Sequence, residues 1–233
     1  MEKKKNKRRS RIQEDLVLLY LRLNGFFVTG FVPHSPEIGR TLTEVDALAL
    51  RMRFSAEPER EVGPHELLDL SDSYTDLAIC EVKSWGKQIQ FNAALTDDER
   101  ALTKILRWSG LFIEQEIPDL VRELQQQLAR RPLAIDAPPT VVGPRDVRIR
   151  CLFFSLERRK QRPNQAWFVS GDDVLEYVHR CFCPDHPRLE CSVSYDIGVW
   201  GEREPMVRYF KQRAGQGPGN LMQLYEALEA ACD

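Results

Sequence analysis

Residues 76–84, DLAICEVKS, combine a strongly apolar run with two ionisable residues of opposite charge, Glu81 and Lys83. Side chains alternate along a strand, so residues two apart lie on the same face. Burying charge in a strand costs free energy, so these two residues are candidates for a functional role. A carboxylate can bind a divalent cation, and a neighbouring lysine can orient water and stabilise charge that develops on a phosphate. The alternative is a structural ion pair at the rim of a sheet.

A second carboxylate stands near the beginning of another apolar segment, TEVDALALRMRF (43–54), at Asp46. An antiparallel pairing of the two segments would bring Asp46 opposite Glu81, because neighbouring strands lie about 4.8 Å apart. Two carboxylates at such a separation repel each other unless a proton or a cation lies between them. Mg²⁺ suits this place, since it takes oxygen ligands and often only one or two carboxylates. Lys83 would then lie beside the metal.

The elements that position these residues follow from hydrophobic periodicity and from capping residues. Residues 11–24 predict a helix with Ser10 as its N-cap and Gly25 just after its end. Three strands are predicted at 26–32, 43–54 and 75–84, with a long connection at 55–75. Further along we expect helices at 97–115, 118–131, 171–181 and 220–232, strands at 146–156, 166–170 and 190–200, and an irregular connection at 132–145. Ser170 or Asp172 caps the helix that follows the 166–170 strand.

Both faces of the second and third strands are apolar, as in strands that are covered by helices on both sides. The order of elements therefore predicts an α/β fold with a mixed central sheet flanked by helices. We expect a basic flexible arm at residues 1–11 and one domain at 12–233, with a core motif at 12–115 completed by 116–233. The arm holds seven basic residues and one acid, and it would either contact phosphates or serve as a solubilising tail.

The order of elements and residues resembles the PD-(D/E)xK, or restriction-endonuclease-like, nuclease superfamily, over about residues 11–115. The matching pieces are Glu14 in QEDLVLLYLRLNGF, Asp46 in TEVDALAL, and Glu81 and Lys83 in ICEVKS. The resemblance implies that Glu14, Asp46, Glu81 and the carbonyl of Val82 bind Mg²⁺, for which Mn²⁺ substitutes. It implies that Lys83 positions the attacking water. The sequence departs from the family pattern in its long 55–75 connection and in having no proline before Asp46.

The resemblance implies a metal-dependent nuclease that hydrolyses phosphodiester bonds, in DNA, in prokaryotic defence, restriction or repair. Its partners would be DNA and other subunits of a defence or repair complex. Two ligand assignments stay open, because Asp15 is adjacent to Glu14 and Glu44 lies two residues before Asp46. The alternative function is a nucleic-acid-binding or assembly module that keeps the nuclease fold and does not cleave.

Basic residues outside the motif are candidates for contacts with a phosphate backbone. A loop between two predicted strands carries Arg158, Arg159, Lys160 and Arg162, and the 97–115 helix carries Lys104 and Arg107. On that helix, lysine and arginine are more often a solvated face, and Trp108 is more often core. There is no glycine-rich nucleotide loop and no serine-hydrolase motif.

The stretch HRCFCPDHPRLEC (179–191) gathers zinc-type ligands at close spacing: His179, Cys181, Cys183, His186 and Cys191. Structural zinc sites more often join two separated pairs of ligands, so we expect a helix end with buried thiols and no zinc. The chain has six cysteines, no apolar stretch long enough to span a membrane and no secretory signal. We therefore expect reduced thiols and a cytoplasmic location.

Overall fold

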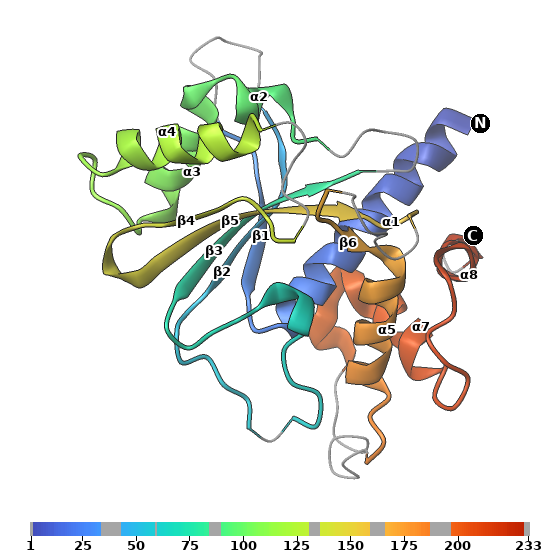
Figure 1. Ribbon diagram of the computed structural model, residues 1–233. Coiled ribbons are helices and arrows are strands. Elements are labelled where there is room, and N and C mark those ends of the chain that lie inside the picture. The colour runs from blue at the N-terminus through green and yellow to red at the C-terminus, as the bar shows by residue number, and fades with distance from the viewer. Residues whose placement is uncertain are drawn as a thin grey trace.

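The computed structural model describes residues 2–33, 43–58, 60–83, 90–130, 136–158, 166–186 and 197–230, with side chains from residue 5 onward. It is a mixed α/β structure in which helices cover both faces of a six-stranded sheet (Figure 1). The strands are β1 (Phe27–Phe31), β2 (Val45–Arg51), β3 (Thr75–Val82), β4 (Thr140–Val142), β5 (Val147–Ser155) and β6 (Val169–Ser170). The helices are α1 (Glu2–Leu23), α2 (Ala93–Thr96), α3 (Glu99–Ser109), α4 (Ile117–Leu128), α5 (Gly171–Phe182), α7 (Glu204–Lys211) and α8 (Leu221–Ala230).

The sheet has the strand order β1-β2-β3-β5-β4, with β6 also pairing with β5. β1, β2 and β3 form an antiparallel meander, whereas β5 runs parallel to β3. In the β2–β3 ladder Ala47 lies opposite Cys80 and Leu48 opposite Ile79. The antiparallel pairing expected from the sequence is therefore confirmed. Continued by one step, this register brings Asp46 opposite Glu81, at the end of these two inner strands.

Two hydrophobic cores lie on the two faces of the sheet. Ala47, Ala78 and Cys80 belong to the core shared with α1, α5, α7 and α8. Leu48, Leu77 and Ile79 belong to the core shared with α2, α3 and α4. Figure 1 shows the same division, with α3 and α4 on one side of the sheet and α1, α5 and α7 on the other. Strands with both faces apolar are thus buried on both faces.

The first helix is longer than the sequence predicts. α1 begins at Glu2, so Ser10 lies inside the helix and is no N-cap, and the flexible arm expected at residues 1–11 is helical from Glu2. Arg8 donates from Nη2 to the carbonyl oxygens of Leu228 (3.0 Å) and Glu229 (3.1 Å) in the last turn of α8. The last carbonyls of a helix attract cations, and this contact ties the first half of α1 to α8. Gly25 has φ of 85° and closes the helix as expected.

Three later elements differ from the expectations. The helix expected at 97–115 ends at Ser109, because Gly110 takes a left-handed conformation with φ of 68°. The proline-rich connection at 132–145 contains β4, which pairs with the first half of β5. Ile197–Arg203 is a 3-10 helix, not the end of a strand, and the rest of the expected 190–200 strand lies outside the described residues. Ser170 caps α5 by accepting the backbone N–H of Asp173.

In the part of the chain that the structure describes, no helix combines the length and the apolar character that crossing a membrane requires.

Candidate active site

The predicted catalytic residues meet where β2 begins and β3 ends. Asp46 is the second residue of β2, and Glu81 and Lys83 stand at and just after the end of β3. Glu81 is 2% exposed, whereas Lys83 keeps a quarter of its side chain exposed. The sheet therefore buries the carboxylate and leaves the ammonium at the edge, within reach of solvent.

Two contacts fix the side chains of this site. Oδ2 of Asp46 accepts a hydrogen bond of 2.7 Å from the backbone N–H of Val82. The Lys83 ammonium forms an ion pair with Oε1 of Glu81. The other carboxylate oxygen of Glu81, Oε2, is buried and has no hydrogen-bond partner among the described residues. A buried carboxylate oxygen without a donor is costly, and it is suited to receive a cation or a water molecule.

The environment of Glu81 shifts the pKa of its carboxyl upward. Burial raises the pKa of this carboxyl above its usual value, and the nearby charge of Asp46 raises it further. Lys83 and a backbone hydrogen bond from Asn92 oppose this rise in the pKa. Asn92 was not a candidate in the sequence, because a backbone contact of this kind leaves no signal in residue type.

Glu14 on α1 lies near enough to Asp46 for the two charges to interact. Burial raises the pKa of the Glu14 carboxyl from 4.5 to about 7, with the charges of Asp46 and Glu44 as the next causes. Asp15, the alternative to Glu14, instead has Arg203 at 3.6 Å and Arg11 at 4.0 Å. Glu14 interacts with Asp46, whereas Asp15 interacts with two arginines, so Glu14 is the better candidate for the metal ligand on α1. Glu44, the alternative to Asp46, is exposed, whereas Asp46 is half-buried against β3.

The donor set fits a hard divalent cation in its chemistry, because carboxylate oxygens are the ligands that Mg²⁺ prefers. The buried Oε2 of Glu81, which has no hydrogen-bond partner among the described residues, and the repulsion of Asp46 with Glu14 and with Glu81 also favour a bound cation. Nevertheless, no three His, Cys, Asp or Glu side chains within the described ranges come together closely enough to hold a metal ion. Binding of a metal would require these carboxylates to draw closer, and Lys83 to loosen its hold on Glu81.

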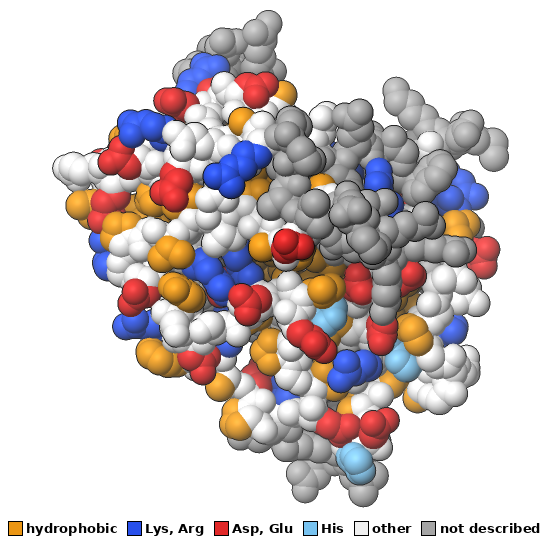
Figure 2. Space-filling view, viewed as in Figure 1, with side chains coloured by type: hydrophobic (Ala, Val, Ile, Leu, Met, Phe, Trp, Pro, Cys, Tyr) orange, Lys and Arg blue, Asp and Glu red, His pale blue; other side chains and the backbone are white. Residues whose placement is uncertain are grey.

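The residues expected to contact nucleic acid are only partly described. Arg107 is exposed, but its Nε and Nη2 donate to the two carboxylate oxygens of Glu114, at 2.6 and 2.7 Å. Lys104 is half-buried on α3, and Arg158 lies in the turn after β5. Arg159, Lys160 and Arg162 lie outside the described residues. Figure 2 shows basic and acidic side chains interspersed over the visible face, without one continuous basic surface.

The cysteine-rich stretch disperses its side chains among different partners. Cys181 accepts from Nη2 of Arg60 at 3.3 Å, whereas Sγ of Cys183 lies 3.2 Å from the carbonyl oxygen of Phe210. His179 contacts the carbonyl oxygen of Arg213, and the backbone N–H of His186 donates to Glu61. Cys191 lies outside the described residues. These contacts give no sign of a shared ligand.

Comparisons with models of known protein families, with curated proteins and with solved structures give no match. The functional argument therefore depends on this chain's own residues.

Proposed function

We propose that the protein is a metal-dependent nuclease that hydrolyses phosphodiester bonds in DNA, with a restriction-endonuclease-like fold and a role in prokaryotic defence, restriction or repair. The observation that carries the proposal is the meeting of Asp46, Glu81 and Lys83 on one rim of the sheet, beside Glu14. The order of elements also supports the proposal, because α1 precedes the antiparallel meander of β1, β2 and β3, and the ends of β2 and β3 carry Asp46, Glu81 and Lys83.

Each residue has a role that its position allows. Asp46, Glu81, Glu14 and the backbone carbonyl of Val82, which follows Glu81 in sequence, would hold Mg²⁺, and Mn²⁺ would substitute. The bound cation would lower the pKa of a water molecule and neutralise a phosphate. Lys83 is partly exposed at the edge of the strand, so its ammonium can donate to a water molecule or to a phosphate oxygen. Val82 fixes Asp46 through its N–H.

A second candidate is a nucleic-acid-binding or assembly module that keeps the fold and does not cleave. It is favoured by the ion pair between Lys83 and Glu81 and by the absence, among the described side chains, of a ready-made group of three metal ligands. Such a protein would bind DNA without a metal, and its rim charges would only stabilise the sheet.

Cleavage of plasmid DNA separates the two candidates. The purified protein is expected to nick or linearise a plasmid with Mg²⁺ or Mn²⁺ and to lose this activity when EDTA is added. Binding without cleavage under every metal condition would support the non-cleaving module. If the protein neither binds nor cleaves DNA, the Glu81–Lys83 pair is a structural ion pair only.

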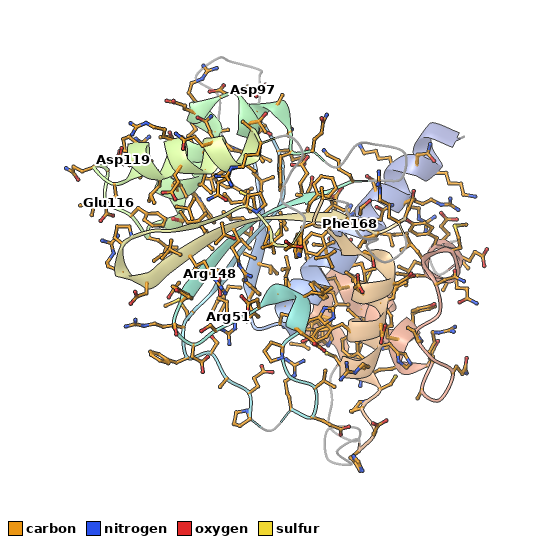
Figure 3. The ribbon with its side chains drawn as sticks, in the orientation of Figure 1. Arg51, Asp97, Glu116, Asp119, Arg148 and Phe168 are labelled. Carbon is orange, nitrogen blue, oxygen red and sulfur yellow. The ribbon has the colours of Figure 1, made fainter. Side chains whose placement is uncertain are left out.

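Two substitutions test the assignment of roles. Asp46→Asn removes a charged ligand, so both metal affinity and cleavage should fall. Lys83→Ala removes no ligand and relieves the repulsion of a cation, so metal binding should persist while cleavage falls by at least about 100-fold. Metal binding is measured by calorimetry, and folding by circular dichroism. Asp119→Asn is the control, since its exposed carboxylate pairs with Arg122 on the surface of α4 (Figure 3). Full cleavage by Lys83→Ala would refute the mechanism.

A further inference from the structure

Charged side chains are also buried at the opposite end of the same strands. Arg51 ends β2, Asp76 stands at the start of β3, and Arg148 and Arg150 stand near the start of β5. Asp76 is fully buried, and the three arginines are 3–8% exposed. Figure 3 shows Arg51 and Arg148 together at this end of the sheet. Three buried arginines around one buried carboxylate leave an excess of positive charge, which is costly without further partners.

Asp76 and the connection at residues 52–74 supply acceptors to these guanidinium groups, although Nε and Nη2 of Arg150 keep no hydrogen-bond partner among the described residues. Arg148 holds Asp76 with two hydrogen bonds, of 2.6 and 3.1 Å, and donates to the carbonyl oxygen of Asp69 at 2.8 Å. Arg150 donates to the carbonyl oxygen of Leu68. Arg51 donates from Nη2 to the carbonyl oxygen of Ser55 at 2.6 Å. The arginines therefore anchor this connection against the sheet.

Arg51 is left with unused donors beside a cavity. Its Nε and Nη1 are buried and have no hydrogen-bond partner within the described chain. The nearest carboxylate, that of Asp72, lies 3.8 Å from Nη2 and is 69% exposed. Arg51 lines a cavity of about 660 Å³, which is within the range of small-molecule sites. Gly25 also lines the cavity, and a Cβ added there would lie 3.5 Å from Nε of Arg51.

The lining of this cavity indicates the chemistry of a ligand. A planar guanidinium with two free N–H donors suits a phosphate group. Phe27, Val62 and Leu70 supply apolar walls, and Phe27 is 71% exposed, so that its ring can stack on a planar group. The acid Glu57 at the mouth is already bound by Arg60, at 2.9 Å.

We propose that the cavity between residues 52–72 and the start of β1 binds a nucleoside monophosphate, with its phosphate on Arg51 and its base against Phe27. Because the Ser55 carbonyl already holds Nη2, the phosphate would take Nε and Nη1 and draw the 55–58 segment aside. The site lies five residues along β2 from Asp46, or about 17 Å. It does not rest on the proposed nuclease function, and it involves none of the same residues.

Calorimetry on the whole protein, in EDTA and without DNA, tests the proposal. Adenosine 5′-monophosphate is expected to bind, and adenosine to bind at least about 10-fold more weakly, because it lacks the phosphate. Arg51→Gln should weaken binding of the monophosphate by about 10- to 100-fold. Phe27→Ala should weaken binding of the monophosphate while leaving the affinity for inorganic phosphate unchanged.

Two matched variants serve as controls. Arg53→Gln removes a nearby arginine that pairs with exposed Asp146, and Phe54→Ala removes an exposed ring outside the cavity lining. Both should bind as the parent protein does. Absence of binding to the parent protein at about 10 mM ligand, equal binding by Arg51→Gln, or equal binding of adenosine would each overturn the proposal. If Arg51→Gln does not fold by circular dichroism, the Phe27→Ala variant and the comparison of the two ligands decide.

Discussion

The position of Glu14 beside the ends of β2 and β3 raises the pKa of its carboxyl. It lies half-buried on α1 and faces the charges of Asp46 and Glu44. Its pKa is raised from 4.5 to about 7, so the folded protein binds more protons than the unfolded chain between these two pH values. The contribution of Glu14 to the free energy of unfolding therefore falls as pH rises through this window.

This sign predicts how Glu14→Gln behaves without metal. At pH 8 the variant should be more stable than the parent protein by about 1–2 kcal/mol, because the full value of about 3 kcal/mol is reduced by solvent screening. At pH 5 the difference should be small, since Glu14 is then protonated in the folded state. Urea unfolding of both proteins in EDTA, at pH 5 and at pH 8, measures this difference in the free energy of unfolding. The control is Glu123→Gln, which changes an exposed residue of α4. A parent protein that is the more stable at pH 8 would contradict the expectation.

Single residues also mark the limit of inference from sequence. Alternation and an antiparallel pairing were enough to place Asp46 opposite Glu81, and the register of β2 and β3 agrees. The preference for Glu14 over Asp15 was open, because adjacent residues of a helix differ by only 100° in direction. Only the packing of α1 shows that Asp15 turns toward Arg203. The burial of Arg51 leaves no signal in the sequence, since its surroundings come from Gly25 and from residues 55–72.

Among the elements, those with strong periodicity were predictable and those held by distant contacts were not. The strands β1, β2, β3 and β5 follow their apolar runs, as do α4 and α8. The first half of α1 has few apolar residues, and its partner α8 lies 220 residues away in sequence. β4 lies among prolines and is only three residues long. In both cases long-range packing decides the conformation and local sequence carries little signal.

The junction of β6 and α5 predicts a strong effect of one methyl group. A Cβ added to Gly171 would overlap the backbone carbonyl of Leu156, and neither backbone can move without breaking the pairing of β5 with β6. Gly171→Ala should therefore reduce the free energy of unfolding by about 3 kcal/mol or more. Gly30→Ala is the matched control, because a Cβ there meets nothing within 4 Å and should change stability by about 0.5 kcal/mol or less. Equal urea midpoints for the two variants would show that the junction is not tight.

The contact of α1 with α8 gives a prediction at the same scale. Arg8→Ala removes the donor to the carbonyls of Leu228 and Glu229, so α8 should open more readily, by about 1 kcal/mol. Hydrogen exchange of the amides of residues 221–230 measures this opening. Lys7→Ala provides the comparison, because Lys7 is exposed on the same helix. Unchanged protection in Arg8→Ala would mean that apolar packing alone holds α8.

For the whole molecule, the distribution of charge sets the expectation for binding to DNA. Among the basic side chains that the structure describes near the start of α1, Arg8, Arg9 and Arg11 make contacts with the protein itself, whereas Lys5 and Lys7 are exposed. The rest of the chain is acidic on balance. Contacts with phosphates are therefore expected from the two lysines rather than from the arginines.

Replacing Lys5 and Lys7 together by alanine should flatten the dependence of DNA affinity on salt. Each neutralised phosphate contributes about −0.9 to the slope of log K against log salt concentration, so the slope should fall in magnitude by about 1 to 2. Fluorescence anisotropy with a labelled duplex over a range of salt gives the slope. A variant with Arg122→Ala and Arg130→Ala loses the same charge elsewhere on the surface. The same slope in all three proteins would exclude the first helix from DNA binding.

The parallel pairing of β3 with β5 has a consequence for how the chain reaches its folded state. Asp76 and Arg148, which join the two strands, are 72 residues apart in sequence, so this central pair cannot form until a long loop closes. The β1–β2–β3 meander closes shorter loops and can assemble first. Chains dominated by such non-local pairings fold slowly, over milliseconds to seconds. During that interval the β5-facing edge of β3, which carries Glu81, stays unpaired and open to association with other chains.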